Sequence, residues 1–179
     1  MITGLILSGG RGTRVGGADK GLLPWQGRPR VEYSIDALRP YCDQLYLNCS
    51  RNPGLYSLYG LPLLTELKHD FPGPLTTLAR WLPELPGDAF LILPCDTPGI
   101  RPEHIEQLLH AGRQHPEHWL YLTSEGRKHP LHSLIPVARV PQLVKGVESG
   151  ESRMMRMLQR MDSLEVPLKE NAVLNMNTF

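Results

Sequence analysis

A glycine-rich segment near the start of the chain carries the residues best suited to chemistry. An apolar stretch at residues 2–7 runs into Ser-Gly-Gly-Arg-Gly-Thr-Arg at residues 8–14, and Asp-Lys-Gly-Leu-Leu follows at residues 19–23. Glycine lets the backbone take left-handed angles and bring its N–H groups close to a ligand, and phosphate is the ligand that such a loop suits. Residues 1–31 contain five Arg or Lys residues and one acidic residue, although the whole chain has a net charge of only +1. Positive charge is therefore concentrated around this segment.

Three kinds of phosphate-binding loop can be compared with this spacing. A P-loop ends in Gly-Lys-Ser/Thr, and it is excluded because Gly17 is followed directly by Ala18 and Asp19. The dinucleotide pattern GxGxxG is met only at Gly10 and Gly12, and no acidic residue closes a second strand about 20 residues later. The third kind, a nucleotidyltransferase loop, is Leu-x-Gly-Gly-x-x-x-Arg followed by a lysine, and residues 7–20 match it throughout. In such a loop backbone amides hold a triphosphate, and the two cations neutralise charge as pyrophosphate leaves.

The opening of the chain resembles that of the molybdenum cofactor guanylyltransferases, which attach GMP to molybdopterin. The residues that carry the resemblance are Leu7, Ser8, Gly9, Gly10, Arg14, Gly16, Gly17, the block at 19–23 and Gly-Arg-Pro at 27–29. The two glycines and the arginine are shared with the wider nucleotidyltransferase superfamily, whereas Asp-Lys-Gly-Leu is particular to this branch. A glycine loop that merely turns the chain is the alternative, but such a turn needs no matched lysine and arginine.

Length and composition predict one domain spanning residues 1–179. A chain of 179 residues is long enough for one buried core and short for two domains. Its pI near 7.8 gives no basic excess for a nucleic-acid partner. No apolar run reaches about 18 residues and no signal peptide is recognisable, so we expect a cytoplasmic protein without a membrane segment. The three cysteines lack metal-ligand spacing and are expected to be reduced, mostly buried thiols.

Apolar periodicity predicts alternating strands and helices. The expected strands are residues 2–7, 44–48, 61–65, 89–93, 119–123, 131–136, 164–168 and 172–174. The expected helices are residues 31–40, 75–82, one that begins at 102, 138–148 and 152–161, and a turn is expected at 125–128. The strand at 89–93 should be central, because its apolar run does not alternate with polar residues. Together with the resemblance, this order predicts a three-layer α/β/α Rossmann-like nucleotidyltransferase fold with a mostly parallel sheet.

Polar residues follow two of the early strands. Asn48 ends the second strand, at the edge where doubly wound sheets bind ligands. The resemblance implies that Asn48 contacts the guanine nucleotide, and a cap for the following helix is the alternative. Glu66 follows the third strand, where family members usually have an aspartate that helps to bind the nucleotide. Gly73 and Thr77 lie in the next helix region, which the resemblance places beside the pterin pocket; Thr76-Thr77 replaces the usual Ala-Gly of the family.

Asp96 follows the predicted central strand in the sequence Pro-Cys-Asp-Thr-Pro, whose Cys-Asp-Thr-Pro also occurs in the resembled family. Mg²⁺ takes one or two carboxylates together with substrate phosphates, so a single aspartate at this edge can anchor it. Mg²⁺ is therefore the expected cofactor, and Asp96 its expected ligand. The alternative is that Asp96 caps the helix that begins near Pro102.

Histidine pairs occur twice in the second half of the chain. The spacings His115-x-x-His118 and His129-x-x-His132 are compatible with a metal site, but no cysteine or carboxylate stands at ligand spacing beside them. The sequence therefore favours solvated surface histidines.

Three residues near the end of the chain complete the resemblance. Arg153 begins a predicted helix at the position of a family arginine that faces molybdopterin, and an exposed, solvated arginine is the alternative. Asn175 and Asn177 belong to Asn-x-Asn-Thr, a family signature that lies near the metal and the pterin phosphate.

The resemblance implies a magnesium-dependent guanylyltransferase that transfers GMP from GTP to molybdenum–molybdopterin and releases pyrophosphate. Its implied catalytic residues are Arg14, Lys20 and Asp96. The implied nucleotide-binding residues are Leu7, Ser8, Gly9, Gly10, Lys20, Asn48, Glu66 and Asp96, with Asp96 also holding the metal. The implied molybdopterin-binding residues are Arg14, Gly73, Thr77, Arg153, Asn175 and Asn177. Partners implied besides GTP and molybdenum–molybdopterin are molybdopterin-biosynthesis proteins and molybdoenzyme chaperones.

Three other functions stay open at the level of sequence. A CTP:molybdopterin cytidylyltransferase usually has Ala-Ala-Gly where this chain has Ser8-Gly9-Gly10, and sugar-phosphate nucleotidyltransferases are usually longer chains. A GTP-binding homologue without catalysis is raised by Thr77 and by the few residues that follow Asn177.

Overall fold

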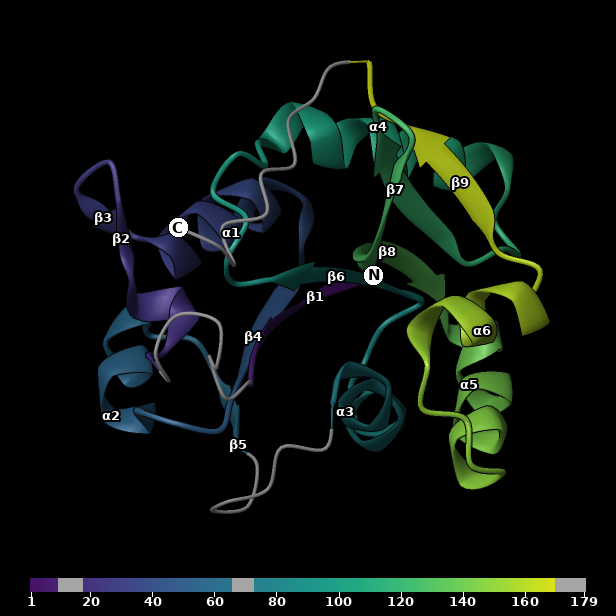
Figure 1. Ribbon diagram of the computed structural model, residues 1–179, viewed down its shortest axis with the longest axis horizontal. Helices are drawn as coiled ribbons and strands as arrows, with labels where there is room; N and C mark the ends of the chain where they lie inside the picture. Colours follow the sequence, from purple (N-terminus) through teal and green to yellow (C-terminus); the bar gives the residue numbers. More distant parts are fainter. Residues whose placement is uncertain (10–17, 66–72, 170–179) are drawn as a thin grey trace.

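The computed structural model describes residues 1–9, 18–65 and 73–169, and in this part of the chain seven strands form one sheet (Figure 1). The order across the sheet is β5-β4-β1-β6-β8-β7-β9. The strands are β1 Ile2–Ser8, β4 Gln44–Cys49, β5 Leu63–Thr65, β6 Ala89–Pro94, β7 Leu120–Ser124, β8 Arg127–Pro136 and β9 Leu164–Pro167. Among the seven described strands of this sheet, β8 runs antiparallel to both of its neighbours, β6 on one side and β7 on the other. The predicted mostly parallel sheet with a central β6 is confirmed.

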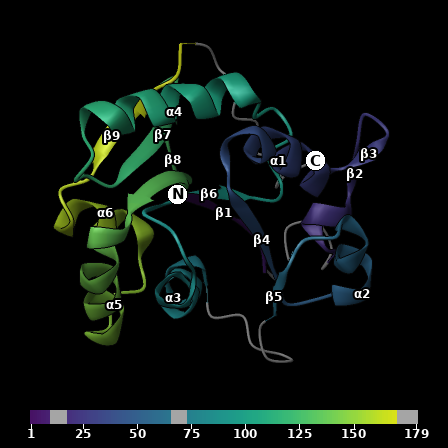
Figure 2. The ribbon, with the colours of Figure 1, turned by 180° about the vertical axis from the view of Figure 1, so that it is seen from behind.

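Helices cover both faces of the sheet, which gives three layers (Figures 1 and 2). On one face lie α1 (Arg30–Leu38) and α4 (Pro102–Gln114), and on the other lie α3 (Pro74–Trp81), α5 (Val140–Glu148) and α6 (Met154–Arg160). Alternate residues of β6 point to opposite layers: Leu91 and Leu93 pack in the core cluster of α1 and α4, whereas Phe90 and Ile92 pack in that of α3, α5 and α6. Burial on both faces explains the uninterrupted apolar run that predicted a central strand.

Two small elements were not predicted from the sequence. A hairpin joins β2 (Pro24–Trp25) to β3 (Arg28–Pro29) through a two-residue turn, whose residues Gln26 and Gly27 have φ angles of 48° and 79°. Positive φ at both central positions is the geometry that suits a tight hairpin. The second element, α2 (Pro53–Tyr56), is a single helical turn after β4. Both are too short to produce a periodic apolar pattern.

Strand β8 begins earlier than the sequence predicted. Its turn consists of Glu125 and Gly126 alone, with φ angles of 49° and 76°, so that pairing with β7 resumes at once at Arg127. The expected turn over residues 125–128 was therefore too long, because a two-residue turn of this type needs no further residues to reverse the chain.

A bulge interrupts the pairing of β8 with β7. Tyr121 lies opposite Ser133, but the next residue, Leu122, lies opposite His129, so residues 130–132 stand outside the ladder. The Ser133 hydroxyl donates to the Pro130 carbonyl at 2.6 Å and accepts from Trp119 Nε1 at 2.9 Å. Bulges change the direction of side chains, and this one lies where the strand borders the cavity described below.

Helix α6 packs its apolar face into the core. Met157, Leu158 and Met161 are buried in the core cluster of α3 and α5, and Met154 is partly buried against the same cluster. The helix begins at Met154, two residues later than predicted. The reason is that the backbone N–H groups of Ser152 and Arg153 donate to the Glu151 carboxylate. The strand predicted at residues 172–174 lies outside the described residues.

The three cysteines are free thiols in the structure. Burial raises the pKa of the Cys42 thiol to about 12, and burial also raises the pKa of the Cys95 thiol. Both side chains therefore stay protonated and unreactive at neutral pH. None of the helices in residues 1–9, 18–65 and 73–169 combines the length and apolar character needed to cross a bilayer.

Candidate active site

A cavity of about 300 Å³ opens at the carboxyl ends of β1, β4 and β6, the edge where open α/β sheets bind ligands. Residues from six elements and their adjoining loops line it. They are Leu7 and Ser8 at the end of β1 and Gly9 after it; Asp19 and Lys20; Asn48 on β4; Pro74 and Thr77 on α3; Pro94 at the end of β6 and Cys95, Asp96 and Thr97 after it; and Lys128, His129, Pro130, Leu131 and His132 on β8.

The register of the three central strands brings the predicted nucleotide-binding residues together. Leu7 lies opposite Asn48 on one side and opposite Pro94 on the other, so the ends of β1, β4 and β6 are level. Gly9, the first residue after β1, does not have a positive φ, and the other glycines of the loop lie outside the described residues. A Cβ at Gly9 would lie 3.0 Å from Asn48 Oδ1, so a larger residue there would require the Asn48 side chain to shift by a few tenths of an ångström.

Asn48 is buried and lines the cavity. Its Nδ2 donates to the Leu64 carbonyl of β5 at 3.1 Å, which ties the side chain to the sheet edge. The residue at the N-cap of α2 is Asn52, so the alternative that Asn48 caps the following helix is wrong. Contact with the nucleotide stays a prediction for this side chain.

Lys20 and Asp96 face each other across the cavity. Lys20 opens a short 3₁₀ helix, η2 (Lys20–Leu22), and its Nζ lies 3.9 Å from Asp96 Oδ2. The exposed fractions of the two side chains are 26% and 11%, so the pair is largely withdrawn from solvent. Helix α4 has Arg101 at its N-cap, and the alternative that Asp96 caps this helix is therefore wrong.

Burial dominates the electrostatics of Asp96. Desolvation raises the pKa of its carboxyl, and the positive charges of Lys20 and of the buried Arg30 act in the opposite direction. The Arg30 guanidinium, at the start of α1, has its own pKa lowered by burial. Nearby cations thus favour the charged carboxylate that burial disfavours.

The side chains that line the cavity suit a metal ion that is coordinated partly by the protein and partly by a substrate. Within the described ranges there is no group of three or more His, Cys, Asp or Glu side chains that could hold a metal ion. Asp19 also lines the cavity, but Tyr56 and Asn52 occupy its carboxylate oxygens. Asp96 therefore offers one carboxylate, which fits Mg²⁺ coordinated jointly with substrate phosphates and does not fit a closed structural site.

Helix α3 forms a second wall of the cavity. Gly73, at its N-cap, has a φ of 88°, a left-handed conformation that favours glycine. Thr77 is buried one turn later, and its hydroxyl donates to the Gly73 carbonyl at 3.0 Å. The threonine that departs from the family pattern thus satisfies its hydroxyl within the helix while its side chain lines the cavity.

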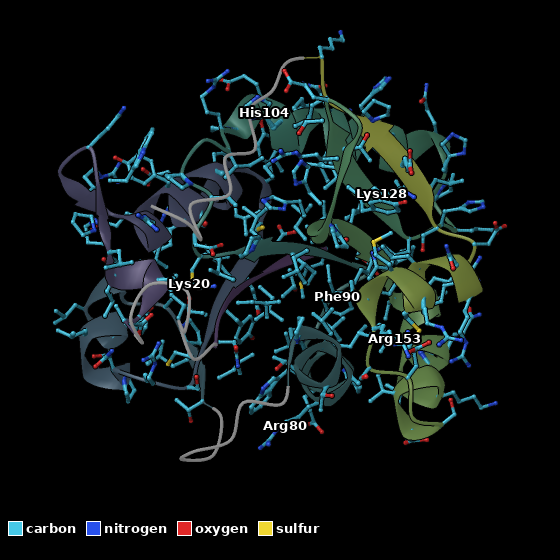
Figure 3. All side chains as sticks on the ribbon, viewed as in Figure 1. Lys20, Arg80, Phe90, His104, Lys128 and Arg153 are labelled. Carbon is cyan, nitrogen blue, oxygen red and sulfur yellow. The ribbon has the colours of Figure 1, made fainter. Side chains whose placement is uncertain are left out.

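Arg153 is not brought together with the other predicted residues. It stands at the N-cap of α6, and Figure 3 shows it over the opposite half of the molecule from Lys20. It lines a separate hollow together with Arg156, Arg160 and Glu151.

Five other predicted residues lie outside the residues that the structure describes, and their roles stay predictions. They are Gly10, Arg14, Glu66, Asn175 and Asn177.

His129 and His132 line the cavity, so the prediction of solvated surface histidines is wrong for this pair. His132 is buried, and a hydrogen bond of 2.9 Å joins its Nε2 to Thr97 Oγ1. A hydrogen bond of 2.6 Å joins His129 Nε2 to Ser124 Oγ. The bulge of β8 is the physical reason for His132, because it takes residues 130–132 out of the ladder; His129 pairs with Leu122 directly before the bulge.

Acid is expected to destabilise the protein through His132. Burial, with a smaller contribution from the neighbouring His129, lowers the pKa of His132 to about 3 in the folded state, against about 6.5 in the unfolded chain. Between these values the unfolded chain binds a proton that the folded chain does not. His132 therefore adds a loss of about 1.4 kcal/mol in the free energy of unfolding per pH unit as the pH falls below 6.5.

The measurement is urea unfolding between pH 7 and 4.5. His132→Gln keeps a side-chain amide near Thr97 but does not titrate, and it should flatten the dependence of the free energy of unfolding on pH. His115→Gln, at an exposed histidine, should keep the wild-type slope. An unchanged slope in His132→Gln would contradict the buried neutral imidazole.

Three further cavity residues with charged or hydroxyl side chains were not selected from the sequence: Asp19, Thr97 and Lys128. Asp19 and Thr97 adjoin Lys20 and Asp96 in the two motifs, and this adjacency was the available signal. Lys128 gave no signal, because its place depends on the start and the bulge of β8; it pairs with Glu165 at 3.3 Å.

Comparison of the sequence with known families and proteins points to one group. The profile of the family described as "MobA-like NTP transferase domain" matches residues 4–165. A molybdenum cofactor guanylyltransferase of Ectopseudomonas mendocina is 35% identical over 177 residues, which cover 97% of this chain and 86% of that protein.

Solved structures share the fold at lower identity. The molybdopterin-guanine dinucleotide biosynthesis protein A of Archaeoglobus fulgidus superposes with a TM-score of 0.73 at 20% identity, over 92% of this chain and 83% of that one. A Mycobacterium tuberculosis protein in complex with manganese superposes with a TM-score of 0.75 at 18% identity, over 99% and 94% of the two chains.

Proposed function

Because the chain belongs to the family of MobA-like NTP transferase domains, we propose that it transfers GMP from GTP to molybdenum–molybdopterin as a molybdenum cofactor guanylyltransferase. The observation that carries this proposal is the position of Lys20 opposite Asp96, in a cavity at the carboxyl ends of β1, β4 and β6. A cation and a carboxylate facing each other across such a cavity suit a triphosphate with its divalent ion.

In the proposed reaction an oxygen of the terminal phosphate of molybdopterin attacks the α-phosphorus of GTP. One phosphoanhydride bond forms there, the bond between the α- and β-phosphates breaks, and pyrophosphate leaves with the electron pair. Leu7 and Ser8 belong to β1, so we assign the approach of backbone amides to the phosphates chiefly to Gly9. The Lys20 ammonium neutralises charge on the departing pyrophosphate, and positioning supplies much of the remaining rate enhancement.

Mg²⁺ is part of the proposal, with Asp96 as its protein ligand. When bound, the ion supplies positive charge to the phosphate oxygens. The single available carboxylate supports this assignment, as does the manganese complex of the structurally similar M. tuberculosis protein. Asp96 must be ionised for this role, and the positive charges of Lys20 and Arg30 favour that form.

The acceptor is assigned to the wall formed by α3 and β8. Thr77 lines the cavity from α3, and the segment 128–132 lines it from β8, which β6 separates from β1 and β4. We assign the β1–β4 side to the nucleotide. A cytoplasmic location, and contacts with molybdopterin-biosynthesis proteins and molybdoenzyme chaperones, are also part of the proposal and depend on the same family membership.

Pyrophosphate release tests the proposed function directly. Purified protein is incubated with Mg²⁺, molybdopterin and either GTP or CTP, and the dinucleotide product is identified by mass. We expect release with GTP that requires both molybdopterin and Mg²⁺ and stops when the metal is chelated. A preference for CTP would contradict the assigned nucleotide, and binding of GTP without any release of pyrophosphate would contradict catalysis.

A further inference from the structure

A buried tyrosine holds the segment that carries Lys20. Tyr56 ends the short helix α2 and is fully buried. Its hydroxyl donates to Asp19 Oδ1 at 2.6 Å, and Asn52 Nδ2 donates to Asp19 Oδ2 at 3.0 Å. Both oxygens of the carboxylate beside Lys20 are therefore bound by one helical turn.

The Asp19 carboxylate makes these contacts and does not make a capping hydrogen bond to its own helix. Asp19 occupies the N-cap of η2, where an aspartate side chain commonly accepts a backbone N–H of the first turn. No such capping bond is present, because the side chain is turned toward α2. Burial raises the pKa of Tyr56, so its hydroxyl stays protonated and continues to donate. The Asp19 side chain thus ties the start of η2 to α2, while the Asp19 carbonyl accepts the Leu22 N–H of η2.

The backbone after Lys20 is confined by the same tyrosine. A Cβ at Gly21 would lie 2.5 Å from the Tyr56 hydroxyl and 3.1 Å from Cys95 Sγ, so the chain passes closely between them. Cys95 immediately precedes Asp96. A further bond of 3.0 Å runs from Arg51 Nη2 to the Ala18 carbonyl. These contacts place the backbone of Lys20 at a fixed distance from the strand end that carries Asp96.

We propose that Tyr56 is a positioning residue, which acts through Asp19 to hold the Lys20 ammonium opposite Asp96 where the triphosphate binds. This inference rests on the proposed function and adds a residue to its machinery. A lysine side chain is long and flexible, so its charge is useful in a transition state only if its backbone is well placed. Tyr56 does not line the cavity, so it supplies that placement from α2 without touching the substrate.

The test compares two chemically identical changes. Tyr56→Phe removes the hydroxyl that binds Asp19, and Tyr59→Phe removes a hydroxyl that donates to Glu32 at 3.0 Å and does not line the cavity. We expect Tyr56→Phe to lower kcat about ten- to a hundredfold with a smaller change in KM for GTP, and Tyr59→Phe to leave kcat near the wild-type value. The melting temperatures of both variants report any general loss of stability.

A double variant separates positioning from a structural role. If Tyr56 acts through Lys20, adding Tyr56→Phe to Lys20→Met should cause no further loss beyond that of Lys20→Met alone. The same comparison is made on the affinity for GTP–Mg²⁺ by calorimetry, without molybdopterin, so that it does not depend on turnover.

Several outcomes would overturn this inference. One is that the losses of kcat from Tyr56→Phe and Lys20→Met multiply in the double variant. Another is that Tyr59→Phe lowers kcat as much as Tyr56→Phe does. The third is that Tyr56→Phe has wild-type kinetics and wild-type affinity for GTP–Mg²⁺. The binding measurement keeps the two proposals apart. A wild-type protein that binds GTP–Mg²⁺ and releases no pyrophosphate contradicts the proposed function alone, and the affinities still decide the role of Tyr56. Absence of binding to both GTP–Mg²⁺ and CTP–Mg²⁺ overturns both.

Discussion

Asp96→Asn is expected to lower kcat at least about a hundredfold while the protein stays folded. The two side chains have the same shape, so the change removes charge and little else. An amide cannot replace a carboxylate as the anionic ligand of a divalent ion, and it no longer attracts the Lys20 ammonium 3.9 Å away. Burial disfavours the carboxylate, so the neutral amide offsets part of the attraction to Lys20 and Arg30 that is lost, and the melting temperature measures the balance.

The measurement is kcat at a series of Mg²⁺ concentrations. Asp96→Asn should require more Mg²⁺ for half-maximal activity, in addition to its lower kcat. Asp88→Asn is a matched control, because Asp88 immediately precedes β6 at the other end of the same strand and is exposed. Near-normal kcat and an unchanged Mg²⁺ requirement in Asp96→Asn would show that the metal is held elsewhere.

Lys20→Met is expected to reduce kcat by a comparable factor, about a hundred or more, because methionine keeps much of the length of lysine and none of its charge. A second effect follows from the ion pair. The charge of Lys20 lowers the pKa of Asp96, so its removal lets burial raise that pKa further. Since the ionised carboxylate is the active form, the acidic limb of the pH–rate profile should move to higher pH.

A pH–rate profile of kcat tests both effects together. Lys145→Met, which removes an exposed lysine of α5 away from the cavity, should leave the magnitude and the profile of kcat unchanged. If Lys20→Met lowered kcat with no displacement of the acidic limb, the electrostatic link between Lys20 and Asp96 would be wrong, although a role of Lys20 in charge neutralisation would remain.

The main layers of the fold were predictable, because they depend on local apolar patterns. β1, β6, α1 and α4 bury continuous or periodic apolar residues. β1, β6 and α1 were placed within one or two residues of their observed bounds, and α4 begins at the predicted residue. Asp96 was found for a related reason. It comes soon after a buried parallel strand, and such a residue lies at the ligand-binding edge of the sheet independently of the other elements of the fold.

The parts of the site that were not predictable depend on contacts between distant segments. The spacing of His129 and His132 suggested either a metal site or solvated surface residues. Their place in a cavity wall depends on the course of β8 around its bulge, which the spacing does not reveal. Tyr56 gave no signal, because α2 is a single turn and its hydroxyl meets Asp19 from 37 residues away. Gly21 belongs to a recognised motif, but the reason for a glycine there, close approach of Tyr56 and Cys95, requires the tertiary structure.

The reversed direction of β8 has a consequence for how this scaffold could change its acceptor. The parallel strands contribute their last residues to the cavity, but β8 contributes residues near its beginning, just after the tight turn at Glu125 and Gly126. Lengthening or shortening that hairpin tip would remodel one wall alone and leave the backbone around Gly9 and Lys20 untouched. Acceptor preference could therefore diverge by insertion at a single surface turn, independently of the choice of nucleotide.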